Sequence, residues 1–61
     1  MTASEVERGK RVQVVEPAPE PYVGQHGKIT SYSRPQSEWW IEVRLDCGDV
    51  SDFRLVELIV G

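Results

Sequence analysis

Apolar and polar residues alternate most regularly between positions 39 and 46 of the chain. The odd-numbered positions there are apolar: Trp39, Ile41, Val43 and Leu45. The even-numbered positions carry the charges and Trp40. A period of two is typical of a strand with one buried face, and a register slip of one residue would bury charged side chains. The pattern therefore predicts a strand over 39–46, with Trp39 in the core and Trp40 outside it.

Four more segments are predicted as strands because they combine short apolar runs with β-branched residues. They are residues 11–16, 28–33, 50–53 and 57–60. The first strand ends at Pro17–Pro21, where three prolines cannot donate to a sheet. Asp46–Asp49 is predicted to form a hairpin turn, with Gly48 in the left-handed conformation. A single helical turn is expected at 54–56. No segment sustains a helical period, so no long helix is predicted.

Five short strands without a helix leave nothing to cover one face of an open sheet. Curling the sheet toward closure protects its edges and builds the core from one set of inward residues. We therefore predict an all-β fold: a five-stranded, partly open barrel over residues 9–61, with one short 3-10 turn before the last strand. Residues 1–8 are expected to be a flexible N-terminal tail. The expected core is Val12, Val14, Ile29, Trp39, Ile41, Val43, Leu45, Phe53 and Leu58.

Size and composition limit the classes of function. The chain has 61 residues, with 7 Lys and Arg against 10 Asp and Glu, which gives a net charge of −3. That length fits one domain with a small core. No apolar run approaches the roughly 20 residues of a membrane span, and the N-terminal residues are polar. Cys47 is the single cysteine, so an intramolecular disulfide is excluded, and a cytoplasmic location is expected.

The chain carries no pattern typical of catalysis or of a bound cofactor. His26 is the only histidine and stands near no nucleophile motif. Asp46, Asp49 and Asp52 are too few for a calcium loop, which also needs a terminal bidentate Glu. We therefore predict that the protein is not an enzyme and has no catalytic residue, no metal ligand and no cofactor.

Two stretches resemble a known family of small barrels. Gly9–Val14, followed by a loop and Tyr22–Ile29, is similar to the KOW-type opening, in which a first strand leads to a Gly-x-x-Gly turn and an apolar second strand. Val43–Asp46, Phe53 and Glu57–Val60 resemble the ending of bacterial Src-homology-3-like barrels. The resemblance covers residues 9–60 and implies an Src-homology-3-like barrel.

Three branches of that fold imply three kinds of partner. KOW-type elongation factors and ribosomal proteins bind nucleic acid through their loops. Signalling domains bind Pro-rich peptides, and Glu38–Trp39–Trp40 resembles their tryptophan doublet. Photosystem I subunit IV has a comparable opening, here Arg8–Val12. A shared barrel does not by itself fix the function.

The aromatic residues favour a protein partner, because a large exposed aromatic side chain is often a binding anchor. Trp40 lies on the charged parity of its strand, and Tyr22 and Tyr32 could lie on the same side of the barrel. Arg34 could orient an acidic group of the partner. The leading hypothesis is a non-catalytic interaction module, a small adaptor or a peripheral subunit, that binds through Trp40, Tyr22, Tyr32 and Arg34.

Two alternatives stay open. A KOW-type RNA or ribosome contact would use Arg8, Lys10, Arg11 and Lys28, because affinity for nucleic acid comes largely from neutralised phosphates. The net charge of −3 disfavours this hypothesis. The other alternative is an accessory subunit of a photosynthetic or other electron-transfer complex.

Overall fold

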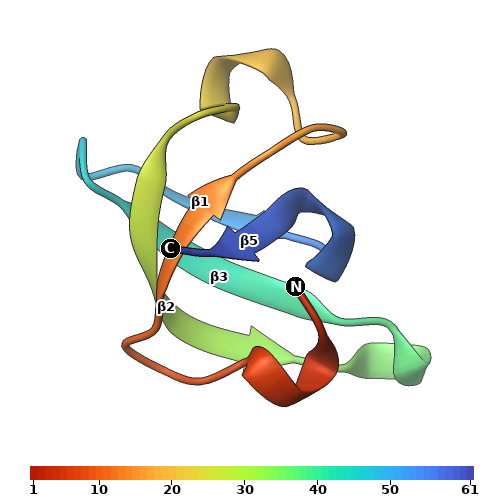
Figure 1. Cartoon of the computed structure of the whole chain (residues 1–61). Coiled ribbons are helices and arrows are strands. Elements are labelled where there is room, and N and C mark those ends of the chain that lie inside the picture. The colour runs from red at the N-terminus through yellow and green to blue at the C-terminus, as the bar shows by residue number, and fades with distance from the viewer.

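The computed structural model of the chain describes residues 1–61 and contains one antiparallel sheet of five strands. The strands are β1 (Arg11–Val14), β2 (His26–Ser33), β3 (Trp40–Leu45), β4 (Val50–Phe53) and β5 (Leu58–Val60). Their order is β4-β3-β2-β1-β5, so β4 and β5 form the two edges and the sheet is not closed (Figure 1). The predicted all-β fold with a partly open sheet is confirmed.

The remaining regular elements are 3-10 turns. They are η1 (Ala3–Glu5), η2 (Glu20–Tyr22), η3 (Pro35–Ser37) and η4 (Leu55–Glu57). The last of these begins one residue after the predicted turn at 54–56 and leads directly into β5, as expected. None of the helices is long and apolar enough to cross a membrane.

The core is the inner face of the curled sheet. Eight of the nine predicted core residues are buried: Val12, Val14, Ile29, Ile41, Val43, Leu45, Phe53 and Leu58. Alternation along β1 and β3 puts five of them, Val12, Val14, Ile41, Val43 and Leu45, on one face, as the period of two requires. Ala18, from the proline-rich loop, completes the cluster. The prediction that Trp39 belongs to the core is wrong, because the structure leaves it half-buried and outside the cluster.

Strands β2 and β3 approach each other closely at Gly27. This residue is buried and pairs with Leu45. A Cβ atom at this position would clash with the Arg44 carbonyl oxygen and would stand 2.9 Å from both the Leu45 Cα and Val43 Cγ1 atoms. Two of these neighbours are backbone atoms that cannot rotate away. The position therefore requires glycine for space, since its φ lies outside the left-handed region.

A buried carboxylate holds η4 in place. Glu57 is 6% exposed, and its Oε1 accepts a hydrogen bond of 2.7 Å from the Arg54 backbone N–H. The Arg54 guanidinium lies 3.6 Å from the other carboxylate oxygen. The side chain thus satisfies a backbone donor at the start of the 3-10 turn, as capping carboxylates do. This contact gives a physical role to the Glu-Leu pair that precedes the last strand.

The N-terminal segment lies against the sheet. Residues 1–8 were expected to be a flexible tail, and the structure places η1 within them. Met1 and Val6 pack against the core cluster, and the Met1 ammonium donates to the carbonyl oxygens of Leu55 and Leu58. The Thr2 backbone N–H and hydroxyl donate to Glu5, which lowers the pKa of that carboxyl. The apolar spacing of Met1 and Val6 is too sparse to predict these contacts from sequence.

We predict that Gly27→Ala lowers the free energy of unfolding by about 2–3 kcal/mol, because the added methyl group forces β2 and β3 apart. Urea unfolding followed by tryptophan fluorescence measures this change. Gly61→Ala is the matched control, since a Cβ there meets no atom within 4 Å, and it should alter the free energy by less than about 0.5 kcal/mol. Equal stability of Gly27→Ala and the unsubstituted chain would contradict the close pairing.

Candidate interaction surface

A β-bulge in β2 determines which aromatic residues meet. Ile29 pairs with Val43, and Ser31 pairs with Glu42, so the register shifts by one at Thr30. After the shift, Tyr32 pairs with Ile41, and Ser33 pairs with Trp40. Residues directly opposite each other in an antiparallel pair share a face. Tyr32 therefore lies on the inner side of the sheet and Trp40 on the outer side.

The ring of Tyr32 packs with that of Trp39. Their ring centroids lie 5.8 Å apart, with the ring planes tilted by 43°. An arginine lies over each ring: the Arg8 Cζ is 5.6 Å from the Tyr32 centroid, and the Arg34 Cζ is 5.5 Å from the Trp39 centroid. These distances are in the range of cation–π contacts. The four side chains, Arg8, Tyr32, Trp39 and Arg34, are called the arginine–aromatic stack below.

Trp39 stays half-buried because the sheet ends beside it. Continuing the β3–β4 register would place Trp39 opposite Leu55, but the chain has already left the sheet and turned into η4. The result is an open hollow of about 300 Å³ between the start of β3 and η4. Its lining is Ser37, Glu38, Trp39, Arg54, Leu55 and Val56.

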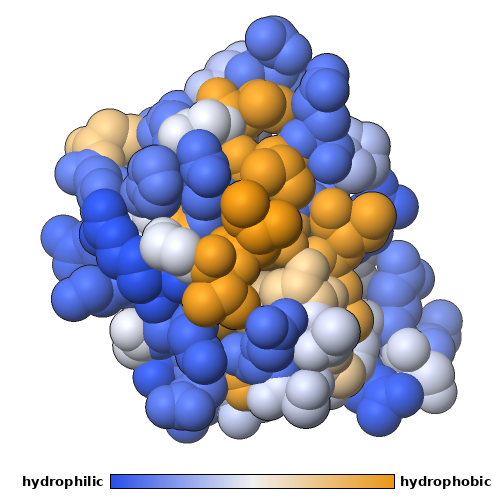
Figure 2. Space-filling model, in the orientation of Figure 1, coloured by the Kyte–Doolittle hydropathy of each residue, from blue (hydrophilic) through white to orange (hydrophobic).

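Apolar side chains continue outward from this hollow. Val56 is 60% exposed, and Ile59 and Val60 of β5 are also exposed. Figure 2 shows hydrophobic side chains gathered on the face where η4 and β5 lie. The hollow thus opens beside an apolar surface. Such surfaces on small proteins mark interaction sites more often than scattered apolar residues do.

Trp40 borders a second, polar hollow on the outer side of the sheet. Trp40 is 39% exposed, as expected from its place among the charged, even-numbered positions of β3. The hollow measures about 200 Å³, and its other lining residues are Ser31, Tyr32, Ser33, Glu42 and Asp52. Glu42 and Asp52 stand directly opposite each other across β3 and β4. Two carboxylates therefore lie next to this indole.

The structure separates Tyr22 from the other aromatic candidates. Tyr22 belongs to η2, which lies at the top of Figure 1, whereas η3 and the start of β3 lie at the lower right. Its ring packs edge-on against buried Phe53, with centroids 5.6 Å apart. Tyr22 thus covers the core through Phe53 and lines neither of the two hollows. Of the four residues proposed for the partner site, Tyr32, Trp40 and Arg34 remain at one end.

The name aromatic end is used below for Tyr32, Trp39, Trp40 and the hollow beside Trp39. Sequence reasoning missed the part of Trp39, Leu55, Val56 and Arg8 in this surface. The tryptophan doublet was the available signal for Trp39, but period-two alternation assigned that residue to the core. Nothing in the sequence brings Arg8 to Tyr32, because that contact depends on the path of the chain before β1.

The basic residues proposed for nucleic acid do not form one patch. Arg8 belongs to the arginine–aromatic stack, whereas Arg11 and Lys28 stand opposite each other on the outer face of β1 and β2. Arg44 extends their row onto β3. Lys10 precedes β1 and is only half-exposed.

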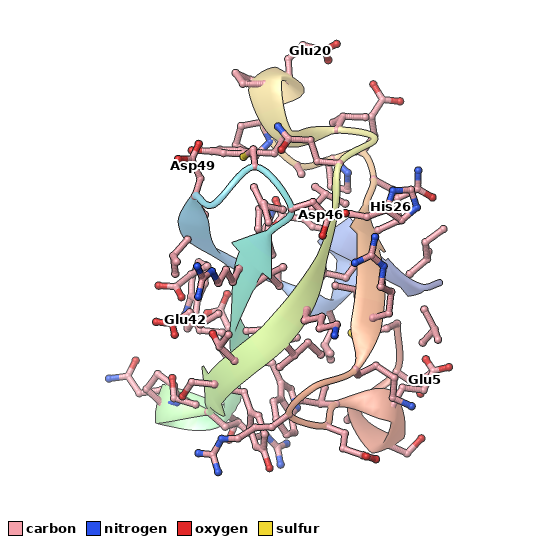
Figure 3. All side chains as sticks on the ribbon, turned by 90° about the vertical axis from the view of Figure 1, so that its left-hand side faces the viewer. Glu5, Glu20, His26, Glu42, Asp46 and Asp49 are labelled. Atoms are coloured by element: carbon pink, nitrogen blue, oxygen red, sulfur yellow. The ribbon has the colours of Figure 1, made fainter.

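Arg11 is held in a bidentate ion pair. Its Nη1 and Nη2 donate to Asp46 Oδ1 and Oδ2 over 2.9 and 2.6 Å. This hydrogen bonding lowers the pKa of Asp46 and raises the pKa of Arg11, and the positive charges of Arg11 and Lys28 further favour the ionised carboxylate. Figure 3 shows Asp46 near His26 at one end of the sheet, with Glu42 farther along β3. The charge of Arg11 is therefore already neutralised within the chain.

The other polar candidates do not assemble into a group that could hold a metal ion. No group of three or more His, Cys, Asp and Glu side chains lies where it could hold a metal ion. Asp46 binds Arg11, while Asp52 faces Glu42. Cys47 is exposed, and its Sγ lies 3.4 Å from Gln25 Oε1.

Comparison with known proteins assigns the chain to no family. No protein-family model, no curated protein and no solved structure matches the chain. The resemblance to KOW-type and Src-homology-3-like barrels therefore stays a prediction.

We predict that the stabilising effect of the Arg11–Asp46 pair is lost in acid. The pKa of Asp46 is lower in the folded chain than in the unfolded one, so the contribution is complete above the unfolded pKa and disappears as the pH falls through the folded pKa. Asp46→Asn should be less stable than the unsubstituted chain at neutral pH, and the difference should close below about pH 4. Urea unfolding at several pH values measures it. A difference that is independent of pH would contradict the ion pair.

Proposed function

We propose that the protein is a non-catalytic protein-interaction module, an adaptor or a peripheral subunit, whose partner docks on the aromatic end. The observation that carries this proposal is the hollow beside Trp39, whose wall is completed by Leu55 and Val56. It is open, largely apolar and free of any catalytic constellation. A hollow of about 300 Å³ is at the lower limit of small-molecule sites and suits one or two side chains of a partner.

The surrounding side chains fit such docking. Tyr32 and Trp40 expose 40% and 39% of their surface, so neither is used up by the core. Aromatic residues of this kind are enriched among interface residues that dominate binding energy. The strained backbone of Gln36 and Ser37, both with positive φ, lies in the loop that leads to Trp39. Strain of this kind tends to occur at functional sites.

A protein partner is favoured over RNA by the orientation of these groups. Single-stranded nucleic acid binds by stacking its bases on open aromatic faces. In this chain Arg8 already lies over the Tyr32 ring and Arg34 over the Trp39 ring. Trp40 has two carboxylates beside it, which repel phosphate. The row of Arg11, Lys28 and Arg44 favours RNA, but Asp46 neutralises part of it.

The resemblance to Src-homology-3-like barrels supports the proposal in a general way, because signalling domains of that type bind extended peptides. An accessory subunit of an electron-transfer complex would be one case of the same function. It would use the same docking surface on a larger assembly.

We predict that Trp39→Ala weakens partner binding by about 2 kcal/mol, roughly 30-fold, because it removes one wall of the hollow. The immobilised chain is used to capture proteins from native extract, and affinities for each captured protein are then measured. Val56→Ser is a second variant, since Val56 is exposed and lies outside the core cluster. It separates loss of binding from loss of folding.

Val50→Ala is the matched control, because Val50 is an exposed apolar residue at the other end of β4. The control should retain the partner that both hollow variants lose. Retention of the same proteins by all four forms would contradict the proposal. So would the absence of any protein retained above background.

A further inference from the structure

The arginine–aromatic stack carries two positive charges that form no ion pair within the chain. The ion pairs of the structure are Arg11 with Asp46 and Arg54 with Glu57. Arg8 and Arg34 take part in neither pair and donate no side-chain hydrogen bond to the protein. A chain with a net charge of −3 thus presents two unpaired guanidinium groups at one end.

Stacking on the rings prepares these groups for a particular kind of ligand. Neither guanidinium donates a hydrogen bond within the protein while it lies 5.5–5.6 Å from its ring centroid, so the N–H donors along its edge stay available to a ligand. That edge matches the two oxygens of a carboxylate, which it binds in bidentate fashion. The ring contact also limits the movement of the long side chain, so less conformational entropy is lost on binding.

The stack adjoins the apolar hollow because Trp39 belongs to both. Arg34 lies over the Trp39 ring, and the same residue lines the hollow together with Leu55 and Val56. Among the charged lining residues, Arg54 is already paired with Glu57, and Glu38 is the single carboxylate. Beside the apolar hollow, Arg8, Arg34 and Glu38 sum to (+2) + (−1) = +1, whereas the carboxylates Glu42 and Asp52 line the other hollow, with Tyr32 and Trp40.

We propose that the partner binds through an acidic segment, in which an apolar side chain enters the hollow and neighbouring Asp or Glu carboxylates bind Arg34 and Arg8. This inference rests on the proposed function and adds the chemical class of the ligand. It selects acidic over Pro-rich basic segments on grounds of charge, since a basic segment would meet two unpaired arginines.

The test is a selection from a phage-displayed random-peptide library on the full chain, followed by binding measurements with synthetic peptides. We expect the selected peptides to share an apolar residue flanked by Asp or Glu. Replacing those acids with Asn or Gln should weaken binding about fivefold, as for solvent-exposed charge pairs, and added salt should weaken it further.

Reversing the charge of a single arginine tests whether Arg34 binds the acidic peptide. Arg34→Glu should lower the affinity for the acidic peptide about fivefold or more. Arg44→Glu changes the net charge equally on an exposed position of the outer face and should leave the affinity within about twofold. In NMR spectra, the signal of the Trp39 indole N–H should shift when the peptide is added, both in the unsubstituted chain and in the Arg44→Glu control.

Three outcomes would overturn the inference, and they differ in what they leave standing. Peptides that shift the Trp39 indole without any preference for acids would refute the acidic partner and leave the interaction function intact. A selection that yields no peptide, with no shift at Trp39, would refute both. Binding of a single-stranded U-rich RNA oligonucleotide that shifts the Trp39 indole while no peptide does would also refute both.

Discussion

The extra residue that Thr30 adds to β2 is the constraint on which the surface of this protein depends. Before it, Ile29 faces the core opposite Val43, and after it Tyr32 shares the inner side with Ile41. The Thr30 hydroxyl lies 2.8 Å from Glu42 Oε1 and 3.3 Å from the Glu42 carbonyl oxygen, which fastens the bulge to β3. Bulges commonly re-aim a side chain in this way. One inserted residue thus sends Tyr32 to Trp39 and leaves Trp40 on the other face.

The core and the strands could be predicted because they follow directly from burial with a period of two. Val12, Val14, Ile41 and Val43 alternate with polar neighbours, and a slip in either strand would bury charge. The absence of any helical period left a curled sheet as the way to cover the apolar face. The 3-10 turn before β5 could also be predicted, and the structure adds that the Glu57 carboxylate accepts a hydrogen bond from the Arg54 backbone N–H at the start of this turn.

The candidate site was harder to predict, because it depends on where the sheet stops and shifts. Alternation alone sent Trp39 into the core, but β4 ends at Phe53 and no strand covers the indole. An unbroken register in β2 would have paired Tyr32 with Trp40, whereas the sequence indicated only that the two residues could lie on the same side of the barrel. A bulge at a β-branched residue such as Thr30 has no distinctive sequence signal. The contact of Arg8 with Tyr32 depends on the same irregularities.

The most direct test of this account is the pattern of nuclear Overhauser effects between β2 and β3 in solution. The bulged register predicts backbone contacts between Tyr32 and Ile41 and between Ser33 and Trp40, together with contacts between the rings of Tyr32 and Trp39. Backbone contacts that pair Tyr32 with Trp40 and Ser31 with Ile41 would show an unbroken register. That result would remove the arginine–aromatic stack and contradict the account.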